Sequence, residues 1–303
     1  MGNNTMPRCS CPSCHNIGIN KYAVRRRGGG NAYLCKYHTQ HLEAYTREND
    51  FRIGEMKANG YTYSVELETS AADFQARLEL CVAGFIPTSD CTVFAEFKSP
   101  IYNGMNGLKA FLPSIQDLID NGDMNIGNNC GTHFHVGHNV YINHFYMSYI
   151  RRFYHSLFVP LSRALEMNNS KATEIFGRDF GYWAQAINEH TDSDEHTNFI
   201  NVQHDYTLEF RRAFFRNAKQ FSRCADFCRK VTEKVVNTFC VEVERLGLTE
   251  GQRLDAEQKA ALKKAADKAA HQMVKEFEKA WKWIKGAKKP PLFFAYWLIN
   301  LIN

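Results

Sequence analysis

Four short stretches of the sequence alternate an apolar residue with a charged or imidazole residue. They are residues 65–68 (VELE), 95–98 (AEFK), 133–136 (HFHV) and 208–211 (LEFR). Residues two apart in a β-strand point to the same face of the sheet. If these stretches are strands, each packs one face on a core and presents a pair of ionisable groups from the other. Carboxylates, imidazoles and basic groups together are typical of a site that binds a divalent metal and polyphosphate.

Each stretch has a simpler interpretation when it is taken alone. Glu66 and Glu68 could lie on the solvated face of an antiparallel strand, and Glu209 with Arg211 could form a salt bridge across strands. A lone His-X-His is about as often a hydrogen-bonded pair as a metal site, and Lys98 alone is expected in solvent. Matched acids and imidazoles from four strands on one face favour the joint interpretation, a site for metal and nucleotide.

The first 45 residues carry a separate set of candidate metal ligands. Cys11 and Cys14 form a Cys-X-X-Cys pair, and Cys35 and His38 form a Cys-X-X-His pair after twenty intervening residues. Two such pairs are the usual plan of a structural zinc site with three thiolates and one imidazole. A segment of this size buries little core, so metal would supply its folding energy. The alternatives are reduced cysteines without metal, or a ligand set that includes one of three further residues: Cys9, His15 and His41.

Composition narrows the class of protein. The chain has 303 residues, of which 44% are hydrophobic, enough for a sizeable core. Its net charge of +5 is uneven, because residues 251–290 hold eleven Lys and Arg against five Asp and Glu. The remainder is nearly neutral, so overall charge does not favour a nucleic-acid protein. No secretion signal is visible and the longest apolar run, residues 291–302, is too short to span a bilayer, so we expect a cytoplasmic protein.

The hydrophobic pattern predicts the elements that must position these residues. The expected strands are residues 63–69, 92–98, 132–137 and 207–212. The first expected helix begins near residue 70 and ends at Gly84. The others cover residues 108–119, 145–166, 213–246 and 254–284. The helix at 145–166 is expected to bend or break near Pro160. Residues 46–61 are expected to form a polar linker. This alternation favours an α+β fold: one curved antiparallel sheet with helices on its outer face and polar groups on its inner face.

The last expected helix, residues 254–284, is amphipathic. One side of it is rich in lysine, and the other side forms an apolar stripe: Leu262, Ala266, Ala269, Met273, Phe277, Trp281 and Ile284. We expect this stripe to dock on the domain or on a second copy of the chain. Docking on a second copy would make a homo-oligomer. The alternative is a surface for an acidic partner, nucleic acid or an anionic lipid headgroup.

The order of the motifs resembles the amidoligase family, small relatives of glutamine synthetase and glutamate–cysteine ligase. Residues 65–68 open the set, and a helix that ends at Gly84 follows. Asp90 and residues 96–100 (EFKSP) come next, and then residues 131–137 (GTHFHVG). Residues 207–211 (TLEFR) close the set, so the resemblance covers about residues 60–220.

This resemblance implies a glutamine-synthetase-like fold and an ATP-dependent carboxylate–amine ligase that forms an acyl phosphate intermediate. Matched motif by motif, five residues would hold two or three Mg or Mn ions: Glu66, Glu68, Glu96, His133 and Glu209. His135 and Arg211 would face the phosphates of ATP or the acyl phosphate, and Lys98 is a further phosphate-binding candidate. Asp90 would position the amine or its ammonium form.

Together these interpretations divide the chain into a zinc module (residues 1–45), an amidoligase-like domain (60–246) and a basic helical extension (247–303). The carboxylate could belong to an amino acid, a peptide, a protein end or a modified base, since the family is common in phage and in peptide- or wall-modifying gene sets. One rival function is a nucleic-acid-associated binding protein on a catalytically idle scaffold, which would use the zinc module, the arginines at 25–27 and the basic helix. Another is a metal-dependent hydrolase, which would not need ATP.

Overall fold

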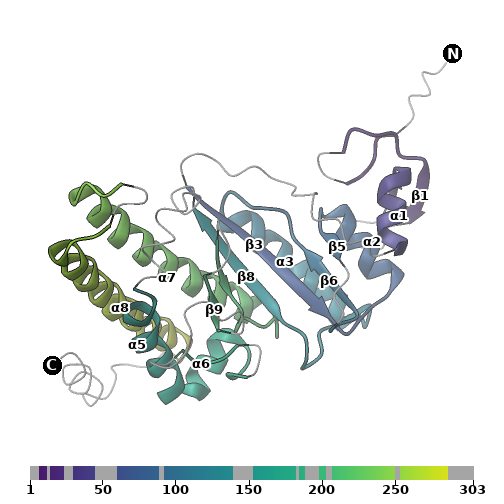
Figure 1. Cartoon of the computed structure of the whole chain (residues 1–303). Coiled ribbons are helices and arrows are strands. Elements are labelled where there is room, and N and C mark those ends of the chain that lie inside the picture. The colour runs from purple at the N-terminus through teal and green to yellow at the C-terminus, as the bar shows by residue number, and fades with distance from the viewer. Residues whose placement is uncertain are drawn as a thin grey trace.

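A computed structural model describes residues 7–11, 14–23, 30–44, 60–88, 92–138, 153–181, 184–187, 198–202, 207–249 and 253–285 (Figure 1). Several predicted features lie outside these residues: Asp90, the arginines at 25–27, nearly all of the linker at 46–61 and the first part of the helix at 145–166. Within the described residues the chain has a mixed α/β fold with seven helices. None of the described helices is long and apolar enough to cross a membrane.

The central element is a six-stranded sheet in which every pair of neighbours is antiparallel. In spatial order its strands are β5 (Ile86–Thr88), β6 (Ala95–Lys98), β3 (Tyr61–Thr69), β8 (Thr132–His138), β10 (Thr207–Phe210) and β9 (Ile200–Asn201). The four strands predicted from alternation are therefore present, and they are adjacent. The two outer strands, β5 and β9, are additions that the pattern did not predict.

The register of the sheet aligns the ionisable residues. Glu66 lies opposite Lys98 on one side and opposite His133 on the other. Glu209 lies opposite His135 in the same way. Residues directly opposite each other in an antiparallel sheet point to the same face. The alternating polar residues of four strands therefore share one face, as expected.

The other face of the sheet forms the main hydrophobic core. Its side chains are completely or almost completely buried and include Val65, Leu67, Phe97, Phe134 and Phe210. Helices α3 (Met105–Asp120) and α7 (Ala218–Arg245) pack against this face, α3 against β3 and α7 against β8 (Figure 1). Burial of these large apolar side chains supplies the main driving force for this arrangement.

Local signals set the ends of the helices. Asp73 accepts a hydrogen bond from the Ala76 N–H at 2.8 Å and caps α2 (Phe74–Val82), and Gly84 follows the helix with a φ of +92°. The chain is not interrupted at Pro160, because α5 (Tyr154–Met167) runs through this residue; the alternative prediction, a bend, stays a prediction. A short helix, α6 (Asn169–Phe176), follows and ends at Gly177, whose φ is +91°.

Helix α8 (Ala256–Lys285) adds an outer layer. It packs against α7 and α5, far from the N-terminal end in Figure 1. The described part of its predicted stripe is buried in the main core: Leu262, Ala266, Ala269, Met273 and Phe277. This apolar side of the helix therefore docks on its own chain.

The N-terminal segment forms a small unit at the opposite end of the molecule. A hairpin of β1 (Asn20–Ala23) and β2 (Asn31–Leu34) leads into α1 (Lys36–Ala44). Helix α1 contacts α2 and the edge strand β5 (Figure 1). Leu34 of the hairpin shares a small apolar cluster with Leu78 and Cys81 of α2, so this unit is packed on the main domain. A two-stranded pair, β4 (Ala71–Ala72) with β7 (Met124–Asn125), completes the fold.

Candidate functional site

The centre of the polar face is a histidine surrounded by carboxylates. His133 Nδ1 lies 3.0 Å from Glu209 Oε1 and 3.5 Å from Glu66 Oε2. Its other nitrogen, Nε2, lies 3.5 Å from Glu68 Oε1. The imidazole is buried, and it comes from the middle of β8, where the strands on both sides supply acids. The two strands that flank β8 thus place their acids around one ring.

Glu209 is the most enclosed of these acids, with only 1% of its surface exposed. Its Oε1 accepts a hydrogen bond from Arg211 Nη1 at 2.7 Å, and its Oε2 accepts one from Asn201 Nδ2 at 2.7 Å. Asn201 belongs to the edge strand β9 and lies opposite Glu209. Charge-assisted hydrogen bonds of this kind allow a carboxylate to stay ionised in a buried position.

A group of oxygen and nitrogen atoms on this face is close enough to share one cation. Glu66, His135 and Glu209 each offer a ligand atom, and these atoms all lie within 4.8 Å of one another. His135 Nε2 is 3.5 Å from Glu66 Oε2, while its Nδ1 is 3.3 Å from the Thr207 hydroxyl. Carboxylate oxygens suit Mg²⁺ or Mn²⁺, so the two glutamates of this donor set fit the expected metal.

Glu68 and Gly131 meet at the end of the polar face where β8 begins. The Gly131 N–H donates a short hydrogen bond to Glu68 Oε2. A Cβ at position 131 would lie 2.5 Å from His133 Nε2, so a side chain there would displace the imidazole. Glycine therefore allows the backbone to approach both ionisable groups.

Lys98 lies on the other side of Glu66, toward the sheet edge. Its Nζ is 3.4 Å from Glu66 Oε1 and 3.5 Å from Glu96 Oε1, and 41% of its side-chain surface is exposed. Burial opposes the charged form of this amine, but Glu66 and Glu96 outweigh that effect and raise the pKa of Lys98 above its ordinary value. The side chain is therefore a cation within reach of solvent, beside two acids.

The close spacing of charges shifts further pKa values. Burial alone would raise the pKa of Glu66, but His135 and His133 hold it well below its ordinary value. Burial, helped by the charge of Glu66, raises the pKa of Glu96 to about 7. Burial lowers the pKa of His133, yet its hydrogen bonds with Glu209 and Glu66 outweigh this and raise the pKa to about 9. The acids thus hold positive charge on an imidazole, at a place where a metal ion would require a neutral one.

The structure brings most of the predicted site residues together. Eight of them lie together on the polar face and at the turn after β10: Glu66, Glu68, Glu96, Lys98, His133, His135, Glu209 and Arg211. Asp90 lies outside the described residues. Asn201 and Thr207, which orient Glu209 and His135, were not among the predicted site residues. Thr207 was within a predicted strand on the same face as Glu209, so the alternation could have identified it.

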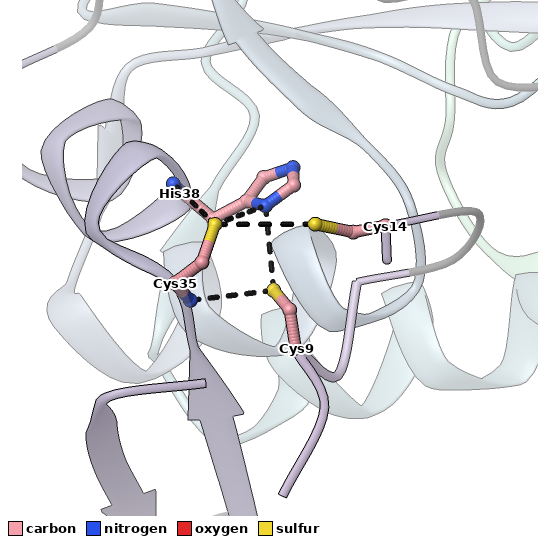
Figure 2. Close-up of side chains that lie close together, drawn as sticks. All are labelled: Cys9, Cys14, Cys35 and His38. Atoms are coloured by element: carbon pink, nitrogen blue, oxygen red, sulfur yellow. Dashed lines mark hydrogen bonds between the residues drawn. The ribbon is translucent and has the colours of Figure 1, made fainter. Parts of the chain in front are cut away.

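A second cluster, of three thiols and one imidazole, lies in the N-terminal unit (Figure 2). Cys14 Sγ is 3.9 Å from Cys35 Sγ, and His38 Nδ1 is 3.2 Å from Cys35 Sγ and 3.4 Å from Cys9 Sγ. Ligands that bind one tetrahedral zinc ion through sulfur are about 3.8 Å apart, since Zn–S bonds are about 2.3 Å long. The cluster could therefore hold a structural metal such as zinc.

Local structure explains why these four side chains converge. Cys35 directly precedes α1 and His38 lies in its first turn, so both project from one side of the helix start. The Cys9 sulfur accepts a hydrogen bond from the Cys35 N–H at 3.4 Å. Burial raises the pKa of the Cys9 thiol, but backbone hydrogen bonds from Cys11 and Cys35 outweigh it and lower the pKa below its ordinary value. Such bonds favour the thiolate form, which is the form that binds metal.

The predicted ligand set differs from this cluster at one position. Cys9 takes the place that the Cys-X-X-Cys spacing gave to Cys11. The Cys11 side chain instead packs beneath the cluster, where its interaction with the Cys81 thiol, together with burial, raises its pKa far above the ordinary value. Cys11 therefore lies outside the group of four residues whose ligand atoms are close enough to share one ion. Cys14, Cys35 and His38 occupy the predicted places.

Comparison of the sequence with protein-family models and with curated proteins found no match to either.

Proposed function

We propose that the polar face of the sheet is the active site of an ATP-dependent carboxylate–amine ligase that works with Mg²⁺ or Mn²⁺. The observation that carries this proposal is the convergence of four acids and two imidazoles from four adjacent antiparallel strands with Arg211 from the turn after β10. The helices on the opposite face and the order of the motifs support a glutamine-synthetase-like fold for the domain.

The site would hold two or three metal ions. Glu66, Glu209 and His135 would hold one ion, because their ligand atoms lie within 4.8 Å of one another. Glu68, Glu96 and His133 would contribute to neighbouring positions. When bound, the metal ions would neutralise charge on the triphosphate and on the substrate carboxylate, which otherwise repel each other.

The basic residues have distinct roles in this proposal. Arg211 is fixed by its 2.7 Å hydrogen bond to Glu209, and a planar guanidinium has the geometry that binds two oxygens of a phosphoryl group in transfer. Lys98 would bind phosphate from the solvent-exposed side of the site. His135 would face the nucleotide phosphates or share a metal ion with Glu66.

The reaction follows from the poor reactivity of a carboxylate. A carboxylate oxygen of the first substrate attacks the γ-phosphorus of ATP, the bond to the β,γ-bridging oxygen breaks, and ADP leaves. An uncharged amine, which has given its ammonium proton to a base, then attacks the acyl carbon. The acyl carbon–oxygen bond breaks, inorganic phosphate leaves, and loss of the second nitrogen proton gives the amide.

The nucleotide products test this proposal directly. Purified protein, ATP and Mg²⁺ are incubated with mixtures of amino acids or peptides, with and without an added amine, and the products are separated by chromatography. We expect ADP and phosphate, with the greatest release when both substrates are present. AMP and pyrophosphate would instead indicate adenylation of the carboxylate and would refute the acyl phosphate route.

The same measurement separates the rival functions. A metal-dependent hydrolase that uses these ligands would act on its substrate in the absence of ATP. A binding protein on an idle scaffold would release no phosphate, even when it retains nucleic-acid affinity. A matched variant, Glu66→Gln, should abolish phosphate release if the polar face is the active site.

A further inference from the structure

Arg178 joins the ends of two site strands, although it lies outside both of them. It follows α6 and Gly177, and its guanidinium points back toward the sheet. Its Nη1 donates to the Cys130 carbonyl at 3.1 Å, and its Nη2 donates to the Arg211 carbonyl. One carbonyl lies just before β8 and the other just after β10. A single guanidinium therefore connects the two neighbouring strand ends that carry site residues.

The first of these contacts leads to a site carboxylate through one peptide group. The carbonyl of the Cys130–Gly131 peptide accepts from Arg178, and the N–H of the same peptide donates to Glu68 Oε2. Hydrogen bonds in series polarise one another, so a cation at the carbonyl makes the N–H a stronger donor. Arg178 is thus linked to Glu68 through two hydrogen bonds.

The second contact fixes the backbone that carries Arg211. The Arg211 N–H donates to the Phe199 carbonyl at 2.9 Å, and its own carbonyl accepts from Arg178. With both backbone groups held, the Arg211 side chain reaches Glu209 at 2.7 Å. Arg178 therefore acts on both carboxylates at this end of the site, Glu68 and Glu209.

Arg178 is itself held in place by Arg212. The Arg212 Nε donates to the Arg178 carbonyl at 3.1 Å. The fully buried Arg212 guanidinium lies 3.8 Å from the centre of the Phe180 ring and donates to Asn169 Oδ1 at 2.7 Å. These contacts, with the left-handed Gly177, define the direction in which Arg178 leaves the backbone.

We propose that Arg178 is a positioning residue of the site, which aims the Gly131 N–H at Glu68 and fixes the turn that carries Arg211. It does this through backbone groups and touches neither metal nor substrate. The effect on metal binding rests on the proposed function, whereas the hydrogen-bonded link from Arg178 to Glu68 does not.

One peptide signal reports on this link. Cys130–Gly131 is the one Cys-Gly pair in the sequence, so protein labelled with ¹³C at cysteine carbonyls and ¹⁵N at glycine gives a single doubly labelled peptide. In Arg178→Ala we expect the Gly131 amide proton to move upfield and to exchange faster with solvent, because its hydrogen bond to Glu68 weakens. Added methylguanidinium should restore the original signal by refilling the lost position.

The control is Arg245→Ala, which removes an exposed arginine whose side chain pairs with Glu242 inside α7. It should leave the Cys-Gly signal unchanged. Arg178→Lys keeps the charge but cannot reach both carbonyls with a planar fork, so we expect a shift between those of the parent and Arg178→Ala. If Arg178→Ala does not fold, the lysine variant decides the question: a signal identical to that of the parent overturns the proposal.

Manganese binding to the same samples, followed by electron paramagnetic resonance, measures the consequence for the site. We expect about tenfold weaker binding in Arg178→Ala, since loss of an outer partner of a ligand typically has this effect. Unchanged binding and an unchanged Cys-Gly signal in a folded variant would overturn the proposal. A parent protein that binds no manganese would count against the proposed function alone, because the peptide signal would still report the Arg178 link.

Discussion

Glu66 and His133 lie directly opposite each other on β3 and β8, and Glu66 Oε2 is 3.5 Å from His133 Nδ1. The same glutamate faces Lys98 across the other side of its strand, at 3.4 Å. Opposite residues in an antiparallel sheet have Cβ atoms about 5 Å apart, so a charged side chain can interact with a residue on each neighbouring strand. This relationship places Glu66 between His133 and Lys98 and makes it the first residue to test.

Glu66→Gln and Glu209→Gln should both weaken the binding of Mg²⁺–ATP, because each removes a ligand charge with little change in shape. Their effects on stability should differ. Only 22% of the Glu66 side chain is exposed, but its partner Lys98 reaches solvent, whereas Glu209 is buried against Arg211 and Asn201. We expect Glu209→Gln to cost about 1–3 kcal/mol, since it leaves a buried guanidinium without its counterion.

Calorimetric titration with Mg²⁺–ATP and thermal unfolding separate these two effects. Glu244→Gln, on the exposed side of α7, is the matched control and should change neither measurement. If both site variants bind Mg²⁺–ATP like the parent, the metal site lies elsewhere in the protein.

Arg211→Lys should reduce turnover far more than ATP affinity. Lysine keeps the positive charge and can still pair with Glu209, but it lacks the planar fork that binds two oxygens at once. That fork matters most while the phosphoryl group is in transfer, so the loss should fall on kcat. Steady-state kinetics and equilibrium nucleotide binding on the same variant give the two quantities. Equal losses in both would make Arg211 a ground-state binding residue.

The N-terminal cluster should carry about one equivalent of zinc per chain, because sites closed by three thiolates and an imidazole bind zinc tightly. Cys9→Ser should lose most of this metal, whereas Cys11→Ser should retain it, since Cys11 lies outside the cluster. Elemental analysis of protein prepared without chelator measures the content. Loss of zinc from Cys11→Ser but not from Cys9→Ser would contradict the ligand set that contains Cys9.

Gly131→Ala should impair metal binding while the fold persists. The new Cβ would lie 2.5 Å from His133 Nε2, the far end of a side chain that can move, so the imidazole should shift away from Glu68. Gly181→Ala is the control, because a Cβ there meets no atom within 4 Å. Manganese titration should separate the two variants, and circular dichroism should give the same spectrum for both. Normal binding by Gly131→Ala would show that His133 need not stay beside Glu68.

Alternation in the sequence predicted the strands that matter most and the face on which their polar residues lie. It succeeded for β3 because the strand's apolar positions, such as Val65 and Leu67, are completely buried while the residues between them are not. It failed for β9, which has two residues, too few to show a period. Asn201 was missed for this reason, although it holds Glu209.

Tertiary contacts explain the other differences from prediction. The spacing of Cys11 and Cys14 suits a metal knuckle, but it carries no information about Cys81, the distant thiol against which Cys11 packs. Arg178 gives no sequence signal at all, since both of its partners are backbone carbonyls and every residue has one. Local patterns therefore indicated candidate ligands more readily than the residues that orient them.

The strict alternation in β3 also limits how the length of this strand can change. Deletion of one residue between Tyr61 and Val65 would turn Val65 and Leu67 toward the charged groups and drive Glu66 and Glu68 against Phe134 and Phe97. Deletion of two residues would keep each side chain on its own face but move the carboxylates by about 7 Å along the strand, away from His133. An insertion or deletion in β3 should therefore damage the site as much as replacement of its glutamates. Changes in length should be tolerated only in the connecting loops.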